Sequence, residues 1–209
     1  GTYYFIASVP STGADGMTYT CASDTVVFEI TQPIEITLDT IALSDYNGYE
    51  ISGYDVNDGS ISVNVVGGLA PYSYEWINQD GDTIEDNNGN LDSLFAGNYT
   101  LTVTDSLGCE IEFDPIVLSS PFPLEINNDD SLQTQYEGYG ISCYGYNDGE
   151  INITVTGGVI PLEYVWTNED GEIISNEEDL SELSAGTYSI NITDLNGNET
   201  NLEIPIDEP

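Results

Sequence analysis

The sequence contains no lysine, arginine or histidine, whereas aspartate and glutamate together number 38 in 209 residues. An average soluble protein is about one quarter charged and carries both signs. No carboxylate can therefore form an ion pair with a side chain of the same chain. The resulting negative field repels phosphate groups and anionic lipids, so nucleic acid is not expected as a partner and cations are favoured.

The same absence removes the side chains on which many enzymes depend. Histidine is the commonest general base, and lysine supplies the amine nucleophile of Schiff-base chemistry. Two carboxylates facing one cleft could still act as in glycosidases. With 38 acidic residues such pairs arise by chance. The sequence therefore predicts a protein that is not an enzyme.

Cysteine and long apolar runs are also scarce. The three cysteines, Cys21, Cys109 and Cys143, are too few for a fold built on disulfides, and their spacing resembles no zinc site. No apolar run approaches the ~20 residues of a membrane-spanning helix, so direct membrane insertion is not expected. Because the chain starts with Gly1 and shows no signal peptide, we expect it to be part of a longer protein.

What the sequence does contain is an internal repeat of about 90 residues. The matching pairs of segments are Pro33–Ile36 and Pro123–Ile126, Asn57–Gly59 and Asn147–Gly149, Gly67–Trp76 and Gly157–Trp166, and Ala96–Tyr99 and Ala185–Tyr188. Gly1–Tyr3 matches Gly97–Tyr99, so we expect 1–33 to be the C-terminal part of a preceding repeat. Two complete repeats are predicted at 34–123 and 124–209, joined end to end.

Each repeat alternates apolar and polar side chains, which is typical of half-buried β-strands. Ile61, Val63 and Val65, for example, alternate with Ser62 and Asn64. About seven such segments fit into one repeat, which predicts an all-β fold of tandem immunoglobulin-like antiparallel β-sandwiches.

Each repeat has one tryptophan, expected on the third strand of its sandwich. Trp76 and Trp166 lie on the apolar side of their segments. We therefore expect both in the core, where such sandwiches often place a tryptophan, rather than on a ligand-stacking face.

The two repeats resemble the SprB-type repeat, which builds very large surface adhesins of Bacteroidota, including the gliding-motility adhesin. The resemblance rests on Asn57–Gly59, Gly67–Trp76 and Ala96–Cys109 and on their counterparts in the second repeat. It implies an extracellular, cell-surface protein that is exported through type IX secretion and acts in adhesion or gliding motility. Polycystic-kidney-disease-type sandwiches are a neighbouring alternative with a similar fold.

The family usually has one cysteine before the Asn-Asp-Gly motif and another after the sixth strand. The first repeat has Gly53 and Cys109 at these positions, and the second has Cys143 and Asn198. The resemblance thus implies either a Cys109–Cys143 disulfide across the junction, which would stiffen it, or two free thiols.

Aspartates recur in equivalent turns of the two repeats. Calcium takes six to eight oxygen ligands, and clustered carboxylates can supply them. The candidate ligands are Asp58, Asp105, Asp148 and Asp194. The same residues are good turn formers, and no complete calcium loop is present, so both interpretations stay open. No other cofactor is expected.

A triplet of Asp, then Ser or Thr, then a small or aliphatic residue recurs more often than the roughly one or two instances that composition predicts. Its acceptor residues are Thr25, Thr40, Thr83, Ser93, Ser106 and Ser131. The triplet resembles the O-glycosylation signal of exported Bacteroidota proteins. Turn chemistry is the competing explanation, because Asp-Ser and Asp-Thr are favoured in turns.

Three functions stay open at this point. The first is a spacer segment of a surface adhesin, with neighbouring repeats of the same chain and surface glycans as partners. The second is an array of carbohydrate-binding modules of a secreted enzyme, which needs a solvent-facing aromatic platform. The third is a subunit of a non-covalently assembled extracellular filament or surface layer, with other filament subunits as partners.

Overall fold

The computed structural model describes residues 2–5, 8–22, 26–85, 88–127, 133 and 135–209. In these ranges the regular secondary structure consists of β-strands, and no helix occurs. The same ranges accordingly hold no helix of the length and apolar character that would cross a bilayer. The N-terminal segment forms two antiparallel pairs, β1 (Thr2–Phe5) with β4 (Val26–Glu29) and β2 (Ser8–Thr12) with β3 (Thr18–Ala22).

The first complete repeat folds into two antiparallel sheets. One sheet has the order β5-β6-β9, formed by β5 (Thr37–Leu43), β6 (Gly59–Val66) and β9 (Leu91–Leu94). The other has the order β11-β10-β7-β8, with β12 also paired to β10. Its strands are β7 (Ser73–Asn78), β8 (Thr83–Ile84), β10 (Gly97–Thr104), β11 (Glu110–Glu112) and β12 (Ile116–Leu118).

The second repeat has the same plan. In place of the three-stranded sheet it has two separate two-stranded sheets, β13 (Glu125–Ile126) with β15 (Val155–Thr156) and β14 (Gly149–Ile151) with β18 (Leu180–Leu183). Its other sheet has the order β17-β16-β19-β20. The strands are β16 (Glu163–Thr167), β17 (Ile173–Ser175), β19 (Gly186–Thr193) and β20 (Glu199–Ile206). The predicted all-β fold of tandem antiparallel sandwiches is confirmed.

Alternation along the strands fills a separate core in each repeat. In β10, Tyr99, Leu101 and Val103 are buried, and the residues between them are half-buried. One apolar cluster draws its buried residues from 36–118, and the other draws them from 141–206. Since the clusters share no residue, each sandwich buries its own apolar surface.

Two aromatic features identify the sandwiches as immunoglobulin-like. Trp76 and Trp166 are completely buried, as expected, and each indole Nε1 donates to a backbone carbonyl, that of Gly89 for Trp76 (3.1 Å). The Tyr99 hydroxyl donates to the carbonyl of Phe95 (2.8 Å), and that of Tyr188 donates to Ser184 (3.0 Å). This is the corner that precedes the sixth strand of immunoglobulin-like domains.

The Gly-Gly motif brings the start of each repeat close to the end of its second strand. Gly67 has a φ of +82°, and a Cβ there would lie 1.9 Å from the carbonyl oxygen of Glu35. Gly157 has a φ of +74° and meets the carbonyl of Pro123 in the same way. Only glycine permits both the positive φ and this approach.

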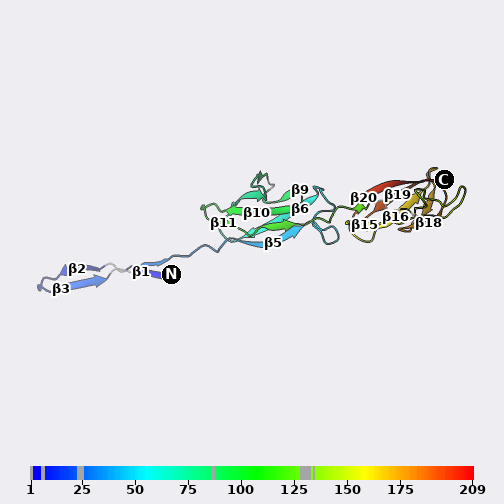
Figure 1. The fold of residues 1–209 in the computed structure, drawn as a ribbon. Helices are drawn as coiled ribbons and strands as arrows, with labels where there is room; N and C mark the ends of the chain where they lie inside the picture. Colours follow the sequence, from blue (N-terminus) through cyan, green and yellow to red (C-terminus); the bar gives the residue numbers. More distant parts are fainter. Residues whose placement is uncertain (1, 6–7, 23–25, 86–87, 128–132, 134) are drawn as a thin grey trace.

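The two sandwiches lie one after the other along a common direction, as Figure 1 shows. β11 lies at the end of the first sandwich that faces the N-terminal segment, and the C-terminus lies at the far end of the second. The two repeats therefore meet at a single junction.

Candidate functional site at the repeat junction

The turn 194–198 of the second repeat is held in shape by one aspartate. Asp194 is 5% exposed, and its Oδ1 accepts the backbone N–H groups of Asn196 (2.9 Å) and Asn198 (2.8 Å). Its Oδ2 accepts the N–H of Val159 and the side-chain amide of Asn198, both at 2.9 Å. Burial raises the pKa of Asp194, but the hydrogen bonds from Asn198 and from the backbone outweigh it, so the pKa lies below its ordinary value.

This turn binds the loop 46–53 of the first repeat through two asparagine side chains. Asn196 Nδ2 donates to the carbonyls of Ser52 (2.8 Å) and Tyr46 (3.3 Å), and its Oδ1 accepts from Asn47 Nδ2 (2.6 Å). Asn198 Nδ2 also donates to the Ser52 carbonyl, at 2.9 Å. The junction is therefore a direct polar contact between folded parts of the two repeats.

The accepting loop is itself fixed by the first repeat. The N–H of Ser52 donates to Asp58 Oδ1 (3.1 Å), and the Tyr46 hydroxyl donates to the carbonyl of Asp58 (3.2 Å). Glu50 Oε2 accepts the N–H of Ser119 at 2.9 Å and also its hydroxyl, and the Ser119 hydroxyl lowers the pKa of Glu50. Because both partners are held in place, forming the junction orders few additional groups.

A cavity of about 230 Å³ lies beside these contacts. It is lined by Tyr54, Phe122 and Pro123 from the first repeat and, among others, by Leu124, Asp194 and Asn198 from the second. Ligand pockets for small molecules have volumes of about 300–1,000 Å³. The junction is therefore suited to holding the repeats together rather than to binding a small molecule.

An equivalent hollow at the end of the first repeat that faces the N-terminal segment is larger. It has a volume of about 490 Å³ and is lined by Ile34, Gly68, Asp105, Cys109 and Ile111, among others. Most of these residues have counterparts that line the junction cavity, as Asp105 and Cys109 correspond to Asp194 and Asn198. Gln32 and Pro33, the last residues of the N-terminal partial repeat, also line this hollow. We call it the hollow face.

The four aspartates predicted as calcium ligands all serve as acceptors for backbone or hydroxyl donors. Asp105 accepts the N–H groups of Leu107 and Cys109 (both 2.9 Å) and of Leu69 (3.1 Å), and the bond from Cys109 is the main cause of its lowered pKa. Asp148 accepts the N–H of Ser142 and also its hydroxyl, which lowers the pKa of Asp148.

No three His, Cys, Asp or Glu side chains gather around a possible metal position among the residues the structure describes. The turn-forming role is thus seen directly at Asp58, Asp105, Asp148 and Asp194. Calcium binding stays a prediction.

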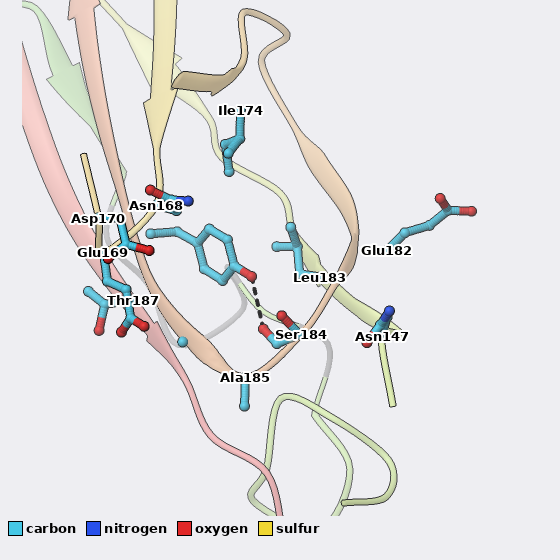
Figure 2. A pocket seen from close by; sticks show the side chains of 12 residues that line it. Asn147, Asn168, Glu169, Asp170, Ile174, Glu182, Leu183, Ser184, Ala185 and Thr187 are labelled. Carbon is cyan, nitrogen blue, oxygen red and sulfur yellow. Dashed lines mark hydrogen bonds between the residues drawn. The ribbon is translucent and has the colours of Figure 1, made fainter. Parts of the chain in front are cut away.

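A further cavity of about 340 Å³ lies in the second repeat beside β18 and the turn 168–170 (Figure 2). Figure 2 shows Asn168, Asp170 and Glu182 around it. Its aromatic lining residue, Tyr188, is only 8% exposed because the ring belongs to the core. This cavity therefore lacks the exposed aromatic platform that a carbohydrate-binding module needs.

Of the two alternatives for Cys109 and Cys143, the structure has the free thiols, and both are exposed. Cys109 directly precedes β11, whereas the loop of Cys143 lies near the C-terminus, where the N–H of Gly145 donates to Glu208 (2.7 Å). β11 and the C-terminus lie at opposite ends of the pair (Figure 1). Cys21 belongs to β3, in the N-terminal segment.

The other two family cysteine positions, occupied by Gly53 and Asn198, are the ones that meet. A Cβ built on Gly53 would lie 2.1 Å from Oδ1 and 2.8 Å from Cγ of Asn198. The junction residues Tyr46, Ser52 and Asn196, and the contact made by Asn198, could not be identified from the sequence. The signal that could have found them is the loss of one cysteine from each repeat at two positions that face each other.

The triplet acceptors that the structure describes are all exposed. They are Thr40 in β5, Thr83 in β8, Ser93 in β9 and Ser106 in the turn after β10. Thr25 and Ser131 lie outside the described residues. O-glycosylation therefore stays a prediction, with acceptors that solvent can reach.

Comparison with known families finds the SprB repeat twice, at residues 52–81 and 141–171. Both matches contain the Asn-Asp-Gly turn, the Gly-Gly motif and the core tryptophan. No curated protein matches the chain.

Three solved structures are similar to this chain at low identity. The N-terminal eight immunoglobulin domains of Down syndrome cell adhesion molecule are 13% identical, with a TM-score of 0.44 over 90% of this chain and 27% of that one. Drosophila OTK extracellular domains 3–5 are 12% identical, with a TM-score of 0.33 over 90% and 65%. The insect immune protein hemolin is 13% identical, with a TM-score of 0.38 over 96% and 62%. The chain spans less than two thirds of each of them.

Proposed function

We propose that this chain, in which two SprB repeats follow one another, is a non-catalytic spacer segment of an extracellular surface adhesin or fibre. The observation that carries the proposal is the junction, where Asn196 and Asn198 of the second repeat donate directly to the Ser52 carbonyl of the first. Side-chain contacts between two folded units limit their relative motion. A spacer needs this property in order to hold an adhesive surface away from the cell.

The composition supports the same role. Like charges spread over a chain of net charge −38 favour an extended arrangement over one in which units fold back on each other. The absence of lysine and arginine also removes the cleavage sites of trypsin-like proteases. Both properties suit a protein that works outside the cell.

The finer parts of the proposal come from the SprB resemblance. They are a position on the cell surface, export through type IX secretion, O-linked glycans at exposed Asp-Ser and Asp-Thr sites, and a role in adhesion or gliding motility. Neighbouring repeats and surface glycans are the expected partners. The array of carbohydrate-binding modules is the less favoured alternative, since both tryptophans are core residues.

Spin-label distances test the spacer function. The labels are placed on cysteines at Thr83 and Ile173, equivalent exposed positions of the two repeats, in a chain whose native cysteines are serine. We expect one narrow distance distribution. Replacement of both Asn196 and Asn198 by alanine should broaden it, because the contacts to Ser52 and Tyr46 are lost. A broad distribution in the parent chain would show a flexible tether and contradict the proposal.

A further inference from the structure

The two asparagine side chains that bond to each other at the junction are each followed by a glycine. Asn47 Nδ2 donates to Asn196 Oδ1 at 2.6 Å, and the next residues in the chain are Gly48 and Gly197. The sequence contains three Asn-Gly pairs in all, and the third lies at 88–89. Two of the three therefore face each other where the complete repeats meet.

An asparagine followed by glycine is prone to deamidation. The backbone nitrogen of the glycine attacks the side-chain Cγ of the asparagine, and the new N–Cγ bond closes a succinimide ring as ammonia leaves. Water then opens the ring at either of its two carbonyl carbons and leaves aspartate or isoaspartate. One water is consumed for each ammonia released, and no oxidant or enzyme is needed. Glycine favours the step because it has no Cβ to hinder the approach.

The docked junction restrains this reaction at both sites. The attacking nitrogens are occupied, since Gly197 N–H donates to the Asp194 carbonyl and Gly48 N–H donates to Asp45 Oδ1, both at 3.0 Å. The Asn196 side chain is held by three hydrogen bonds to the first repeat, so its Cγ cannot swing towards Gly197. A Cβ on either glycine would meet nothing within 4 Å, so the surrounding space is open. Local opening of the junction should therefore control the rate.

Conversion of either asparagine would in turn disrupt the junction. An aspartate at position 196 would place a carboxylate oxygen against the carbonyls of Ser52 and Tyr46, and a carboxylate can only accept hydrogen bonds. An aspartate at position 47 would face Asn196 Oδ1 in the same way. The added negative charge has no lysine, arginine or histidine of the chain to neutralise it.

Turn conformation alone does not require these asparagines. Asn47 has a φ of +56°, and Glu137, its equivalent in the second repeat, has a φ of +52°. The equivalent of Asn196 in the first repeat is Leu107, in the turn beside the hollow face. Both asparagines thus occur in the copies that meet each other and are replaced in the other copies.

We propose that Asn196 and Asn47 are deamidation sites, that docking of the two repeats slows the reaction, and that conversion at either site separates the repeats irreversibly. The inference deepens the proposed spacer function, because a stiff segment would become a flexible tether as the protein ages outside the cell. Only this biological setting rests on the proposed function; the reaction and its control rest on the junction contacts.

Deamidation rates test the control by docking. The chain is incubated in mildly alkaline buffer made with heavy-oxygen water, so that only new deamidation carries the label, and peptide mass spectrometry locates it. Gly53→Ala opens the junction without altering either Asn-Gly pair, because its Cβ would lie 2.1 Å from Asn198 Oδ1. A net hydrogen bond shifts an equilibrium roughly 2- to 12-fold, so deamidation at Asn196 and Asn47 should be at least about twofold faster in this variant.

Two controls accompany these rates. Cys143→Ala changes the equivalent position of the second repeat, which is exposed, and should leave the rates at both junction sites as in the parent chain. Asn88, away from the junction, should deamidate equally fast in all three chains. Equal rates at Asn196 in the parent chain and in Gly53→Ala, or the same acceleration at Asn88, would overturn the inference.

Spin-label distances test the consequence. In the chain labelled at positions 83 and 173, Asn196→Asp should broaden the distance distribution as Asn196→Ala does. Leu107→Asp, which adds the same charge at the equivalent exposed position, should leave it narrow. A narrow distribution in Asn196→Asp would also overturn the inference. The spacer function is judged separately, by the width of the distribution in the fresh parent chain, and the deamidation rates require no spin label.

Discussion

Gly53 and Asn198 are 145 positions apart in the sequence, yet a Cβ on Gly53 would lie 2.1 Å from the amide oxygen of Asn198. Asn198 occupies this space because its Nδ2 donates both to the Ser52 carbonyl and to Asp194. The contact between the repeats therefore requires glycine at position 53. The equivalent residue of the second repeat is Cys143, which shows that the backbone itself accepts a side chain there.

Removing one junction asparagine should uncouple the repeats. Asn196→Ala loses the donors to Ser52 and Tyr46, and each net hydrogen bond contributes about 0.5–1.5 kcal/mol. We expect the two repeats to unfold at more separated denaturant concentrations, as measured by urea titration with fluorescence. Leu107→Ala, the same position in the first repeat, is the matched control and should change stability by at most about 0.5 kcal/mol. Equal effects of the two substitutions would mean that the turn, not the junction, is responsible.

Acid should destabilise the fold through the aspartates that hold the turns. Asp105 and Asp194 have pKa values below their ordinary 3.8 in the folded chain, because backbone N–H groups, and for Asp194 also the Asn198 side chain, stabilise the carboxylates. A lowered pKa contributes stability above about pH 3.8, and this stability is lost as the pH falls through the folded-state pKa. Thermal melting at constant high salt should show this loss. The double variant Asp105→Asn, Asp194→Asn should have a lower melting temperature than the parent chain at pH 6. Its melting temperature should also depend less on pH below pH 4.

Salt should stabilise the chain, and calcium provides a separate test. With 38 carboxylates and no basic side chain, raising sodium chloride should raise the melting temperature by screening repulsion. Specific calcium binding would raise the melting temperature further at fixed ionic strength, because a ligand that binds only the folded state stabilises it by mass action. We expect a higher melting temperature in millimolar calcium than in the presence of a chelator. An unchanged melting temperature would contradict the prediction that calcium is bound by Asp58, Asp105, Asp148 and Asp194.

Native material should carry O-linked glycans at the exposed triplets. Thr40, Thr83, Ser93 and Ser106 are accessible, which a bulky modification requires. The intact mass of the native protein should exceed the mass of the bare sequence. The substitution Asp105→Glu should remove the glycan from Ser106 alone. A native mass equal to that of the bare sequence would contradict the prediction.

The fold within each repeat could be predicted from the sequence because its determinants are local. Alternation along β10 places Tyr99, Leu101 and Val103 in the core, and the apolar side of the third strand carries Trp76. Period-two alternation determines which face of a strand is buried, whatever lies beyond the repeat.

The junction could not be predicted in the same way. Its contacts join Asn196 and Asn198 to backbone carbonyls, and any residue type can supply a backbone carbonyl. The cysteine pattern left a contact between Cys109 and Cys143 as one of two alternatives, whereas the positions that meet across the junction are 53 and 198. The orientation of the second repeat decides that Gly53 meets Asn198, and that Cys109 and Cys143 lie at opposite ends.

The most direct measurement of the junction is a disulfide built into it. In a chain with Cys21, Cys109 and Cys143 changed to serine, Gly53→Cys with Asn198→Cys should form an intramolecular disulfide in a glutathione redox buffer. Cleavage at acidic residues and mass spectrometry would identify the linked peptides in the monomer. The control, Asp80→Cys with Asn198→Cys, should remain reduced, because Asp80 lies in the turn between β7 and β8 rather than at the junction. Free thiols at 53 and 198, or disulfides formed only between chains, would contradict the end-to-end contact on which the spacer function depends.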